Sequence, residues 1–474
     1  MKPNTPTLES LSSIHADGSK KSLHPADVRG PFTRWRRLAA LVMLTIYVAL
    51  PWIPVNGYPA VFLDVVERRF HFFGITFATQ DLWIGFFVVT GLAFSLFYVT
   101  ALFGRLWCGW TCPYTVFLEN VYRRIERLID GDATARRALD AAPWTGMKIT
   151  KRVTKHALYL LVSAVIAHVA LSYFVSLHGL YEMMCGPPQK HLIAFGVVLF
   201  LTAALYGSFS WFREQFCVIL CPYGRLQSAL TDDHSVVIGY DKKRGEPRGK
   251  GESAGACVDC RRCVQVCPTG IDIRNGLQLE CIGCSACVDA CDEIMTKLHR
   301  PTGLVRYDSH TGLHGGKTRY IRPRTLFYTF MLLAGITAFF VASRSLSPMS
   351  ASLVRMQGAS YFVQDGVVRN QFTIRVINKR NREGTFRITL DGQLPADIQV
   401  SGNEQVLTLA PMQENQRTLI ISVPVKSFHD GILFKARITD TETNDSVLTR
   451  GIELLGPDPR LQNHAPLNPK DYLQ

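Results

Sequence analysis

Apolar and polar stretches alternate along this chain on the scale of a membrane crossing. A helix that spans a bilayer needs about 20 predominantly apolar residues. Runs of suitable length lie at 38–55, 82–104, 157–177, 191–212 and 325–343. Pro51 and Pro54 would kink or end the first of them. The pattern therefore predicts an α-helical membrane bundle of five spans, with the first four in a membrane domain at 38–239.

Basic residues between these runs indicate the orientation of the helices, because positively charged loops are retained in the cytoplasm. The connections at 56–81 and 178–190 carry only Arg68, Arg69 and Lys190. The connection at 105–156 is far more basic and holds Arg123, Arg124, Arg127, Arg136, Arg137, Lys148, Lys151, Arg152 and Lys155. With five spans, the polar tail at 1–37 is expected to be mobile and cytoplasmic, and the C-terminus is expected outside.

Composition agrees with a membrane protein that has soluble parts, since 47% of its 474 residues are hydrophobic and only 19% are charged. The formal net charge of +14 raises the question of a nucleic-acid partner. The basic residues flank the apolar runs, however, and no basic stripe is interleaved with aromatic residues. We therefore expect the lipid bilayer as a partner and no nucleic acid.

Eight cysteines form two copies of one motif. The spacing C-x2-C-x2-C-x3-C occurs at 257–267 and again at 281–291, and it is typical of bacterial ferredoxins that hold two [4Fe–4S] clusters. The first three cysteines of each copy bind one cluster, and the fourth binds the other. We expect one cluster on Cys257, Cys260, Cys263 and Cys291. We expect the second on Cys281, Cys284, Cys287 and Cys267.

The alternatives for these cysteines are a disulfide framework or a pair of zinc sites, which the interlocked spacing disfavours. Asp292 stands where a proline usually follows the last cysteine, which changes the local turn and removes no ligand. Thiolate-bound clusters need reducing conditions, so the ferredoxin segment at 240–324 is expected in the cytoplasm. Arg261 and Arg262 beside Cys260 are expected to tune cluster charge or to dock an electron donor.

A second cysteine motif, C-x3-C-P-Y, occurs at Cys108 and Cys112 and again at Cys217 and Cys221, each time after an apolar run. Cysteines at i and i+4 share one face of a helix, which suits two soft ligands of one metal. If two halves of an internal repeat pack together, four thiolates would meet and favour Cu(I), zinc or an iron–sulfur cluster. The alternative is that these cysteines are simply buried and apolar.

Weaker candidate ligands lie in and after the third expected span. His168 is near the middle of that span, where an ionisable residue is either functional or satisfied by a neighbouring helix. The following loop combines imidazole and sulfur groups that suit copper, although its methionines could equally pack at the interface. These residues are His178, Met183, Met184, Cys185 and His191.

The rest of the chain is predicted to contain a linker and a β domain. Residues 240–256 are rich in Lys, Arg and Gly, which indicates a flexible tether. Short alternating runs such as 371–377, 385–390 and 417–423 are separated by turn residues, which is typical of an immunoglobulin-like sandwich. The predicted fold is therefore a multi-domain membrane protein. It combines the helical bundle with an inserted α+β ferredoxin domain and an all-β immunoglobulin-like sandwich at 344–474, which is expected to be structural or to bind a partner.

Together these parts resemble the cytochrome c oxidase accessory protein family, the CcoG, FixG or RdxA group, over nearly the whole chain. The resemblance rests on both C-x3-C-P boxes, the double ferredoxin motif and the β-rich C-terminal segment. It also rests on Gly57-Tyr-Pro-Ala-Val-Phe-Leu-Asp64, Arg68-Arg69-Phe70, Gln80-Asp81 and Arg322-Pro323-Arg324.

The resemblance implies a protein of the bacterial inner membrane, with its C-terminal domain in the periplasm, that serves assembly of cbb3-type cytochrome oxidase. The implied cofactors are two [4Fe–4S] clusters, and the implied chemistry is reduction of Cu(II) to Cu(I). It makes Cys108, Cys112, Cys217 and Cys221 the candidate copper or electron-transfer residues. The expected partners are copper, an unidentified electron donor, and oxidase assembly factors or a copper chaperone; a homodimer stays open.

Two other functions also remain open from the sequence. One is an electron conduit from quinol or a cytoplasmic donor to a redox partner, which would share the C-x3-C-P boxes. The other is a non-enzymatic copper chaperone or assembly scaffold, in which the clusters only stabilise the fold.

Overall fold

The computed structural model divides the chain into two compact units, Met1–Ile75 with Leu82–Val341, and Thr76–Asp81 with Ala342–Gln474. The residues it describes are 22–66, 69–78, 83–249, 251, 253–278, 280–344, 349–356, 358, 360–380, 382–392, 397–402, 406–410, 413–428, 432–444 and 446–457. Most of the expected tail at 1–37, Arg68 and the Gln80-Asp81 pair lie outside these residues.

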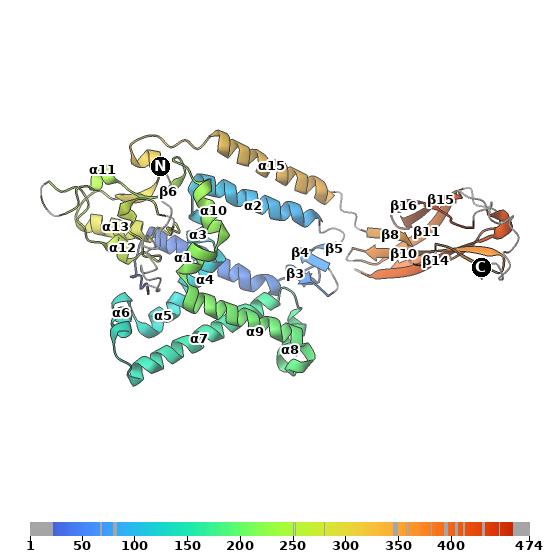
Figure 1. Cartoon of the computed structure of the whole chain (residues 1–474), viewed down its shortest axis with the longest axis horizontal. Coiled ribbons are helices and arrows are strands. Elements are labelled where there is room, and N and C mark those ends of the chain that lie inside the picture. The colour runs from blue at the N-terminus through green and yellow to red at the C-terminus, as the bar shows by residue number, and fades with distance from the viewer. Residues whose placement is uncertain are drawn as a thin grey trace, which may run out of the picture. The chain divides into compact units, whose positions relative to one another are not determined.

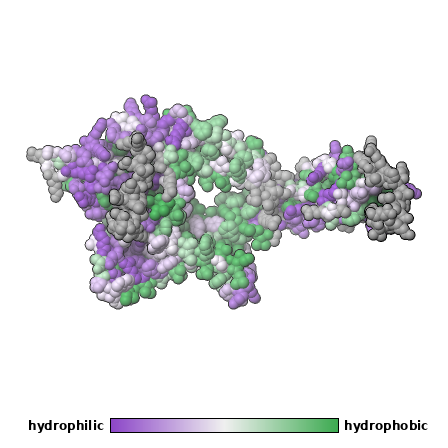
Figure 2. Space-filling model, in the orientation of Figure 1, coloured by the Kyte–Doolittle hydropathy of each residue, from purple (hydrophilic) through white to green (hydrophobic). Residues whose placement is uncertain are grey.

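The first unit is built on long apolar helices (Figure 1). Within the described residues, four helical segments are long and apolar enough to cross a membrane: α2 (Trp83–Phe103), α7 (Gly146–Leu171), Pro188–Phe212, which contains α9 (Leu192–Gly207), and α15 (Pro323–Arg344). Hydrophobic residues cover the outside of this region, as expected of helices that are apolar all round and face lipid (Figure 2). Four of the five predicted spans are thus confirmed as candidate membrane helices.

The first predicted span forms helix α1 (Pro31–Ala49), which begins before Leu38. It is not among the four candidate membrane helices, because Arg34, Arg36 and Arg37 at its start shorten its apolar part. Its far end nevertheless lies beside the end of α7, where Tyr47 Oη donates a hydrogen bond to the carbonyl of Ile166 at 2.9 Å.

Short elements follow α1 and α7 at the end of the bundle away from the ferredoxin. Leu63 N in β3 donates to the carbonyl of Tyr173, just after α7, at 2.7 Å. The elements here are η2 (Leu50–Trp52), β1 (Pro54–Val55), β2 (Tyr58–Pro59), β3 (Val61–Asp64), β4 (Arg69–Phe72), β5 (Ile75–Ala78), α8 (Leu177–Cys185) and η5 (Pro188–His191).

The basic connection between α2 and α7 folds into short helices at the opposite end of the bundle. They are α3 (Leu106–Trp110), α4 (Pro113–Phe117), η4 (Leu118–Tyr122), α5 (Arg123–Asp130) and α6 (Ala133–Ala141). After α9 the chain continues through η6 (Ser208–Phe212), η7 (Phe216–Leu220) and α10 (Pro222–Leu230). These segments carry both C-x3-C-P motifs.

The cysteine-rich segment is a small domain closed by an antiparallel strand pair, in which β6 (Val236–Tyr240) pairs with β7 (Val305–Ser309). Its helices are α11 (Lys242–Gly245), α12 (Arg262–Gln265), η8 (Ile273–Asn275), α13 (Ala286–Lys297) and α14 (His310–Leu313). The expected flexible tether is not found in the described part of 240–256. Ala256 N donates to Arg244 O at 2.9 Å, and Arg244 donates to Thr302 O at 3.0 Å. Tyr240, the last residue of β6, pairs with Val305 of β7. Because Tyr240 is already part of the ferredoxin domain, the residues that follow it do not act as a tether to that domain.

The segment from Ser22 to Gly30 also differs from the expected free tail, because it lies against the ferredoxin domain. Ala26 N donates to Gln265 O at 2.8 Å. Asp289 accepts hydrogen bonds from Phe32 N at 3.2 Å and Thr33 N at 2.7 Å. The first N–H groups of a helix have no acceptor within the helix. At the start of α1 the carboxylate of Asp289 in α13 acts as that acceptor.

The second unit is a sandwich of two antiparallel sheets. One sheet has the order β12-β14-β10-β8 with β9 also paired to β10, and the other has the order β13-β11-β15-β16. Phe372, Phe386, Leu419 and Phe434 lie in its core. The strands are β8 (Met349–Arg355), β9 (Phe362–Gln364), β10 (Val367–Asn378), β11 (Gly384–Gly392), β12 (Gln399–Ser401), β13 (Leu407–Leu409), β14 (Glu414–Pro424), β15 (Leu433–Asp440) and β16 (Ser446–Glu453), with the turn η9 (Val425–Ser427). The predicted all-β sandwich is confirmed.

Candidate functional site

The ferredoxin domain contains two cavities lined by cysteines. The first, of ≈ 360 Å³ including its open mouth, is lined by Cys257, Cys260, Cys263 and Cys291. The second, of ≈ 330 Å³ measured in the same way, is lined by Cys267, Cys281, Cys284 and Cys287, and Cys263 also reaches it. The structure therefore gathers the cysteines in the two sets that the spacing predicts, each with a fourth cysteine from the other copy of the motif.

These cavities fit iron–sulfur clusters. They are similar in volume, and apart from the cysteines their walls are largely apolar, with Ile238, Ile271, Val305 and Leu304 among them. Burial raises the pKa of both Cys281 and Cys291 to about 12. Cluster iron would supply the positive charge that such buried thiols need in order to bind as thiolates.

Arg274 lines the first cavity and was not identified from the sequence. It is buried, and a hydrogen bond to Asp272 at 2.6 Å raises its pKa in spite of that burial. A permanent positive charge beside four thiolates offsets their negative charge, and net charge is one of the factors that set a cluster's reduction potential. Asp292 lies inside helix α13 and accepts a hydrogen bond from Gly303 N at 2.8 Å, so the helix simply continues where a proline was expected.

In both C-x3-C-P motifs the second cysteine precedes a new helix, so the cysteines of each motif do not share a helix face. Cys112 and Cys221 are the N-caps of α4 and α10, with φ, ψ of −58°, 122° and −67°, 111°. The following prolines, Pro113 and Pro222, explain this, because proline drives the residue before it out of the α region. The prediction of an i, i+4 pair on one helix is therefore wrong: the backbone turns between the two cysteines.

The tyrosines of the two motifs show that the halves of the repeat pack together. Tyr114 Oη of the first motif donates to the carbonyl of Arg213, after the helical segment of the second half, at 2.7 Å. In return, Tyr223 Oη of the second motif lies 2.5 Å from Thr100 Oγ1 in α2 of the first half. This reciprocal exchange brings the motifs side by side. The four residues Cys108, Cys112, Cys217 and Cys221 are called the thiol box below.

Within the thiol box Cys108 is buried, and Cys112, Cys217 and Cys221 are half-buried. Burial raises the pKa of Cys108 to about 11, against the opposing effect of Gln227, whose Nε2 donates to Cys108 Sγ at 3.3 Å. Burial also raises the pKa of Cys217, and the thiols of Cys112, Cys108 and Cys221 raise it further. Cys108 and Cys217 thus each lie close enough to the other cysteines of the thiol box for their charges to interact. Gln227 lies in α10, so the second motif's helix orients a thiol of the first, which spacing alone could not reveal.

The thiol box packs directly on the loop that carries the second cysteine set. Cys108 belongs to one buried apolar cluster with Ile282 and Cys284. At Gly109 a β-carbon would lie only 2.7 Å from the carbonyl oxygens of Ile282 and Gly283, so glycine is what permits this close approach.

A chain of hydrogen bonds crosses the same contact. Trp110 Nε1, beside the thiol box, donates to Tyr307 Oη at 3.1 Å. Tyr307 Oη in turn donates to Gly283 O at 2.8 Å and receives a bond from Ser285 Oγ at 2.6 Å. The ferredoxin and the ends of the membrane helices are thus joined at the residues on either side of Cys284.

The weaker candidate ligands are not brought together. His168 Nδ1 lies 2.7 Å from the carbonyl of Ala164 in its own helix. His178 is 85% exposed and pairs with Glu182 at 3.1 Å. Met183 is half-buried, and Met184, Cys185 and His191 are exposed. Among the described residues, no group of three or more His, Cys, Asp or Glu side chains is placed to hold a single metal ion. This holds for the weaker candidate ligands and also for the thiol box.

Known protein families match three regions of the chain. A 4Fe-4S dicluster domain matches residues 212–310, and a 4Fe-4S binding domain matches residues 82–130. The C-terminal match, at residues 339–457, is to the IG-like fold at the C-terminus of FixG. Both C-x3-C-P motifs fall within the iron–sulfur matches.

Curated relatives match over most of the chain. It is 34% identical to nitrogen fixation protein FixG of Rhizobium meliloti, across 81% of this chain and 82% of that protein. It is 34% identical to protein RdxA of Cereibacter sphaeroides, across 80% and 84%, and 33% identical to protein RdxB of the same organism, across 89% and 91%. With these identities over most of both chains, and with the matching cysteine domains and C-terminal fold, the protein belongs to the FixG/RdxA family of membrane-bound iron–sulfur electron-transport proteins.

Proposed function

We propose that this iron–sulfur protein is a cupric reductase that delivers Cu(I) for the assembly of a cbb3-type cytochrome oxidase. The observation that supports this most directly is the packing of Cys108 in one apolar cluster with Cys284. A soft-metal ligand of the membrane region thereby lies against the loop of the second cysteine set. Electrons held in the ferredoxin domain would have a short route to copper at the thiol box.

In the proposed reaction the clusters would supply the electrons, and the thiols of the chain would bind the copper. When bound to the two cysteine sets, the clusters supply single electrons at low potential. One electron converts one Cu(II) to one Cu(I), and thiolates favour the Cu(I) product over Cu(II). The thiols of Cys108 and Cys217, whose pKa values are raised, would release their protons as copper binds, so copper capture at the thiol box is expected to strengthen as the pH rises.

The proposed orientation follows from charge and from contacts within the first unit. The basic connection at 105–156 and the ferredoxin domain lie at the same end of the bundle, which we assign to the cytoplasm. Helix α1 begins at Asp289 of the ferredoxin domain and ends beside Ile166 near the far end of α7. We therefore assign α1 as a fifth span, which leaves the immunoglobulin-like unit on the periplasmic side.

The test replaces Cys108 and Cys217 by serine together. The variant should keep its iron and its visible cluster absorption, because neither residue lines a cluster cavity, and it should lose copper reduction measured with a Cu(I)-selective chelator. A matched control is Cys185→Ser, which removes an exposed cysteine that is not part of the thiol box. Copper reduction at the unmodified rate by the double variant would contradict the proposal and favour an electron conduit to a protein partner or a quinone.

A further inference from the structure

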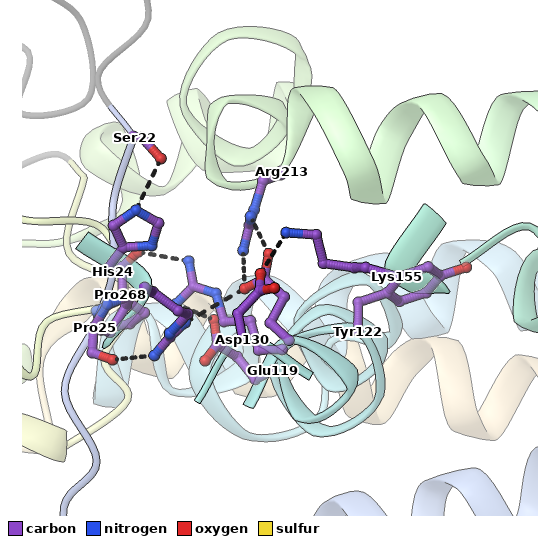
Figure 3. A network of polar contacts seen from close by, with 12 residues as sticks. Ser22, His24, Pro25, Glu119, Tyr122, Asp130, Lys155, Arg213 and Pro268 are labelled. Atoms are coloured by element: carbon purple, nitrogen blue, oxygen red, sulfur yellow. Dashed lines mark hydrogen bonds and ion pairs between the residues drawn. The ribbon is translucent and has the colours of Figure 1, made fainter. Parts of the chain in front are cut away.

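A network of buried charges joins the basic connection to Arg213 and to Pro25 of the N-terminal segment, whose carbonyl accepts a hydrogen bond from Arg136 at 2.9 Å (Figure 3). Glu126 accepts hydrogen bonds from Arg213 at 2.7 and 3.0 Å and pairs with Arg136 at 3.4 Å. Asp130 pairs with Lys155 at 2.5 Å. In this part of the network each buried cation has a carboxylate partner, as burial of charge requires.

Beside this balanced network lies a cavity whose wall is strongly positive. It measures ≈ 620 Å³ including its open mouth, and Asp27 and Glu119 are the carboxylates in its lining. Its six arginines are Arg36, Arg37, Arg123, Arg124, Arg127 and Arg136. This cavity is called the arginine pocket below. Val266, Pro268 and Ala286 of the ferredoxin domain also line it.

The floor of the arginine pocket holds buried guanidinium groups with free donors. Arg123 and Arg136 are 7% and 5% exposed, and their Nε atoms are buried without a hydrogen-bond partner among the described residues. Burial lowers the pKa of Arg136; Glu126 opposes this effect, and Arg123 adds to it. A buried donor without a partner is costly, so negative charge held in the pocket would offset part of the cost of burying these guanidinium groups.

The rim of the arginine pocket carries arginines that no carboxylate of the described residues pairs with. Arg37 and Arg124 are exposed and form no ion pair with the described residues, whereas Arg127 pairs with Asp27 at 2.9 Å. Guanidinium groups bind phosphate oxygens through paired, charge-assisted hydrogen bonds. The chemistry that suits both the floor and the rim is therefore a phosphate group.

The surroundings of the pocket indicate where such a phosphate comes from. Arg36 and Arg37 directly precede the apolar part of α1, where Leu38, Leu41 and Val42 are 48%, 61% and 44% exposed. A lipid whose phosphate met these arginines could lay its acyl chains along that exposed face. Anionic lipids are attracted to clusters of arginine and lysine at the ends of membrane helices.

We propose that the arginine pocket binds the phosphate headgroup of an anionic phospholipid, with its acyl chains along the exposed face of α1. Two of the pocket's arginines also hold the ferredoxin domain. Arg36 donates to the carbonyl of Cys284 at 3.1 Å, and Arg123 donates to the carbonyl of Pro268, next to Cys267, at 3.0 Å. A bound lipid thereby fixes the arginines that hold the backbone at Cys284 and next to Cys267, two residues of the second cysteine set.

The test titrates the purified full-length protein in detergent micelles with phosphatidylglycerol or with phosphatidylcholine of the same acyl chains, and counts bound lipid by native mass spectrometry. Phosphatidylglycerol should bind and phosphatidylcholine should not. Arg124→Gln combined with Arg127→Gln should weaken binding about 25-fold, about fivefold for each arginine removed. Arg137→Gln is the matched control, because Arg137 is an exposed arginine of α6 that does not line the pocket.

A second experiment adds inorganic phosphate alone to the purified protein and measures its thermal unfolding. Stabilisation by inorganic phosphate that the double variant abolishes, without binding of phosphatidylglycerol, would overturn the lipid and identify a soluble phosphate as the ligand. Equal binding of phosphatidylglycerol by the double variant and the Arg137→Gln control would overturn the site itself. Neither result depends on copper, so the outcome is separate from that of the copper experiment.

Discussion

Replacement of Gly109 by alanine tests the contact between the thiol box and the second cysteine set. The new β-carbon would lie 2.7 Å from two backbone carbonyl oxygens, those of Ile282 and Gly283. Such contacts are essentially never shorter than 3.0 Å, so the loop and the thiol box must separate by at least 0.3 Å, the difference between 3.0 and 2.7 Å. No side-chain rotation relieves the clash, and Tyr307 holds Gly283 O in place at 2.8 Å.

The size of the effect follows from two opposing terms. Overpacking of a close contact costs about 1–3 kcal/mol, and alanine in place of glycine in a helix returns up to about 1 kcal/mol. If the full return applies, the net loss is up to about 2 kcal/mol, which should lower the Tm by up to roughly 8 °C, using about 2–4 °C per kcal/mol for a unit of this size. Copper reduction should slow as well, because the thiol box moves away from the loop.

The assay compares Gly109→Ala with Gly91→Ala by thermal unfolding of the cluster-loaded protein and by the initial rate of Cu(I) production. Gly91 lies in α2, and a β-carbon there meets nothing within 4 Å, so the control should be neutral or slightly stabilised. A Gly109→Ala protein with the same Tm and the same rate as the control would refute the packing of the thiol box on the ferredoxin loop.

Substitutions elsewhere give further expected outcomes. Burial alone would raise the pKa of Glu126, but Arg213 and its hydrogen bonds lower it from 4.5 to about 2, so Glu126→Gln should cost about 3 kcal/mol in the free energy of unfolding at neutral pH. Because the folded pKa is the lower one, this stability is present above pH 4.5 and is lost as the pH falls toward 2, which unfolding curves at a series of pH values would show. Asp289→Ala should leave the N–H groups of Phe32 and Thr33 without their acceptor, at a cost of about 1 kcal/mol, and should expose the N-terminal segment to limited proteolysis. Cys291→Ala should lower the iron content from about eight to about four atoms per chain.

Each of these outcomes has a result that would contradict it. The control for Glu126 is Glu293→Gln, which removes an exposed pair with Lys297 at 2.6 Å and should cost about 0.3–0.5 kcal/mol; equal losses would contradict the buried network. A proteolysis pattern unchanged by Asp289→Ala would show that the segment at 22–30 is not held through that carboxylate. A full iron content in Cys291→Ala would require a different fourth ligand for the first cluster.

The parts of the fold that the sequence predicts best are those with a local, repeated signal. Membrane-length apolar runs predict α2, α7, Pro188–Phe212 and α15, and the alternation at 371–377 predicts one of the strands of the sandwich. The double cysteine spacing predicts the division of the eight cysteines between two cavities because it reflects the geometry of cluster binding itself.

The differences arise where distant segments decide the local structure. The segment at 22–30 is polar enough for a free tail, but Asp289, far along the chain, accepts hydrogen bonds from the start of α1. Residues 240–256 have the composition of a linker, yet β6 and β7 enclose them within a domain. Neither partner is visible from the composition of the segment alone.

The thiol box shows what the C-x3-C-P motif can predict about the structure and what it cannot. The spacing and the shared Pro-Tyr sequel indicate two equivalent motifs, and Tyr114 and Tyr223 pack the two halves together. The helix-face argument fails because Pro113 and Pro222 turn the backbone at the second cysteine of each motif. The role of Gln227 depends on a tertiary contact with Cys108, and no sequence signal marks it.

The most direct test of copper reduction is a single-turnover measurement without oxygen. The clusters are reduced chemically, excess reductant is removed, Cu(II) is added, and loss of cluster electrons is followed optically while a Cu(I)-selective chelator measures product. One Cu(I) formed for each electron lost, with the transfer abolished when Cys108 and Cys217 are replaced, is the predicted result. Clusters that stay reduced in the presence of Cu(II), and reoxidise only when a quinone or a partner protein is added, would contradict it.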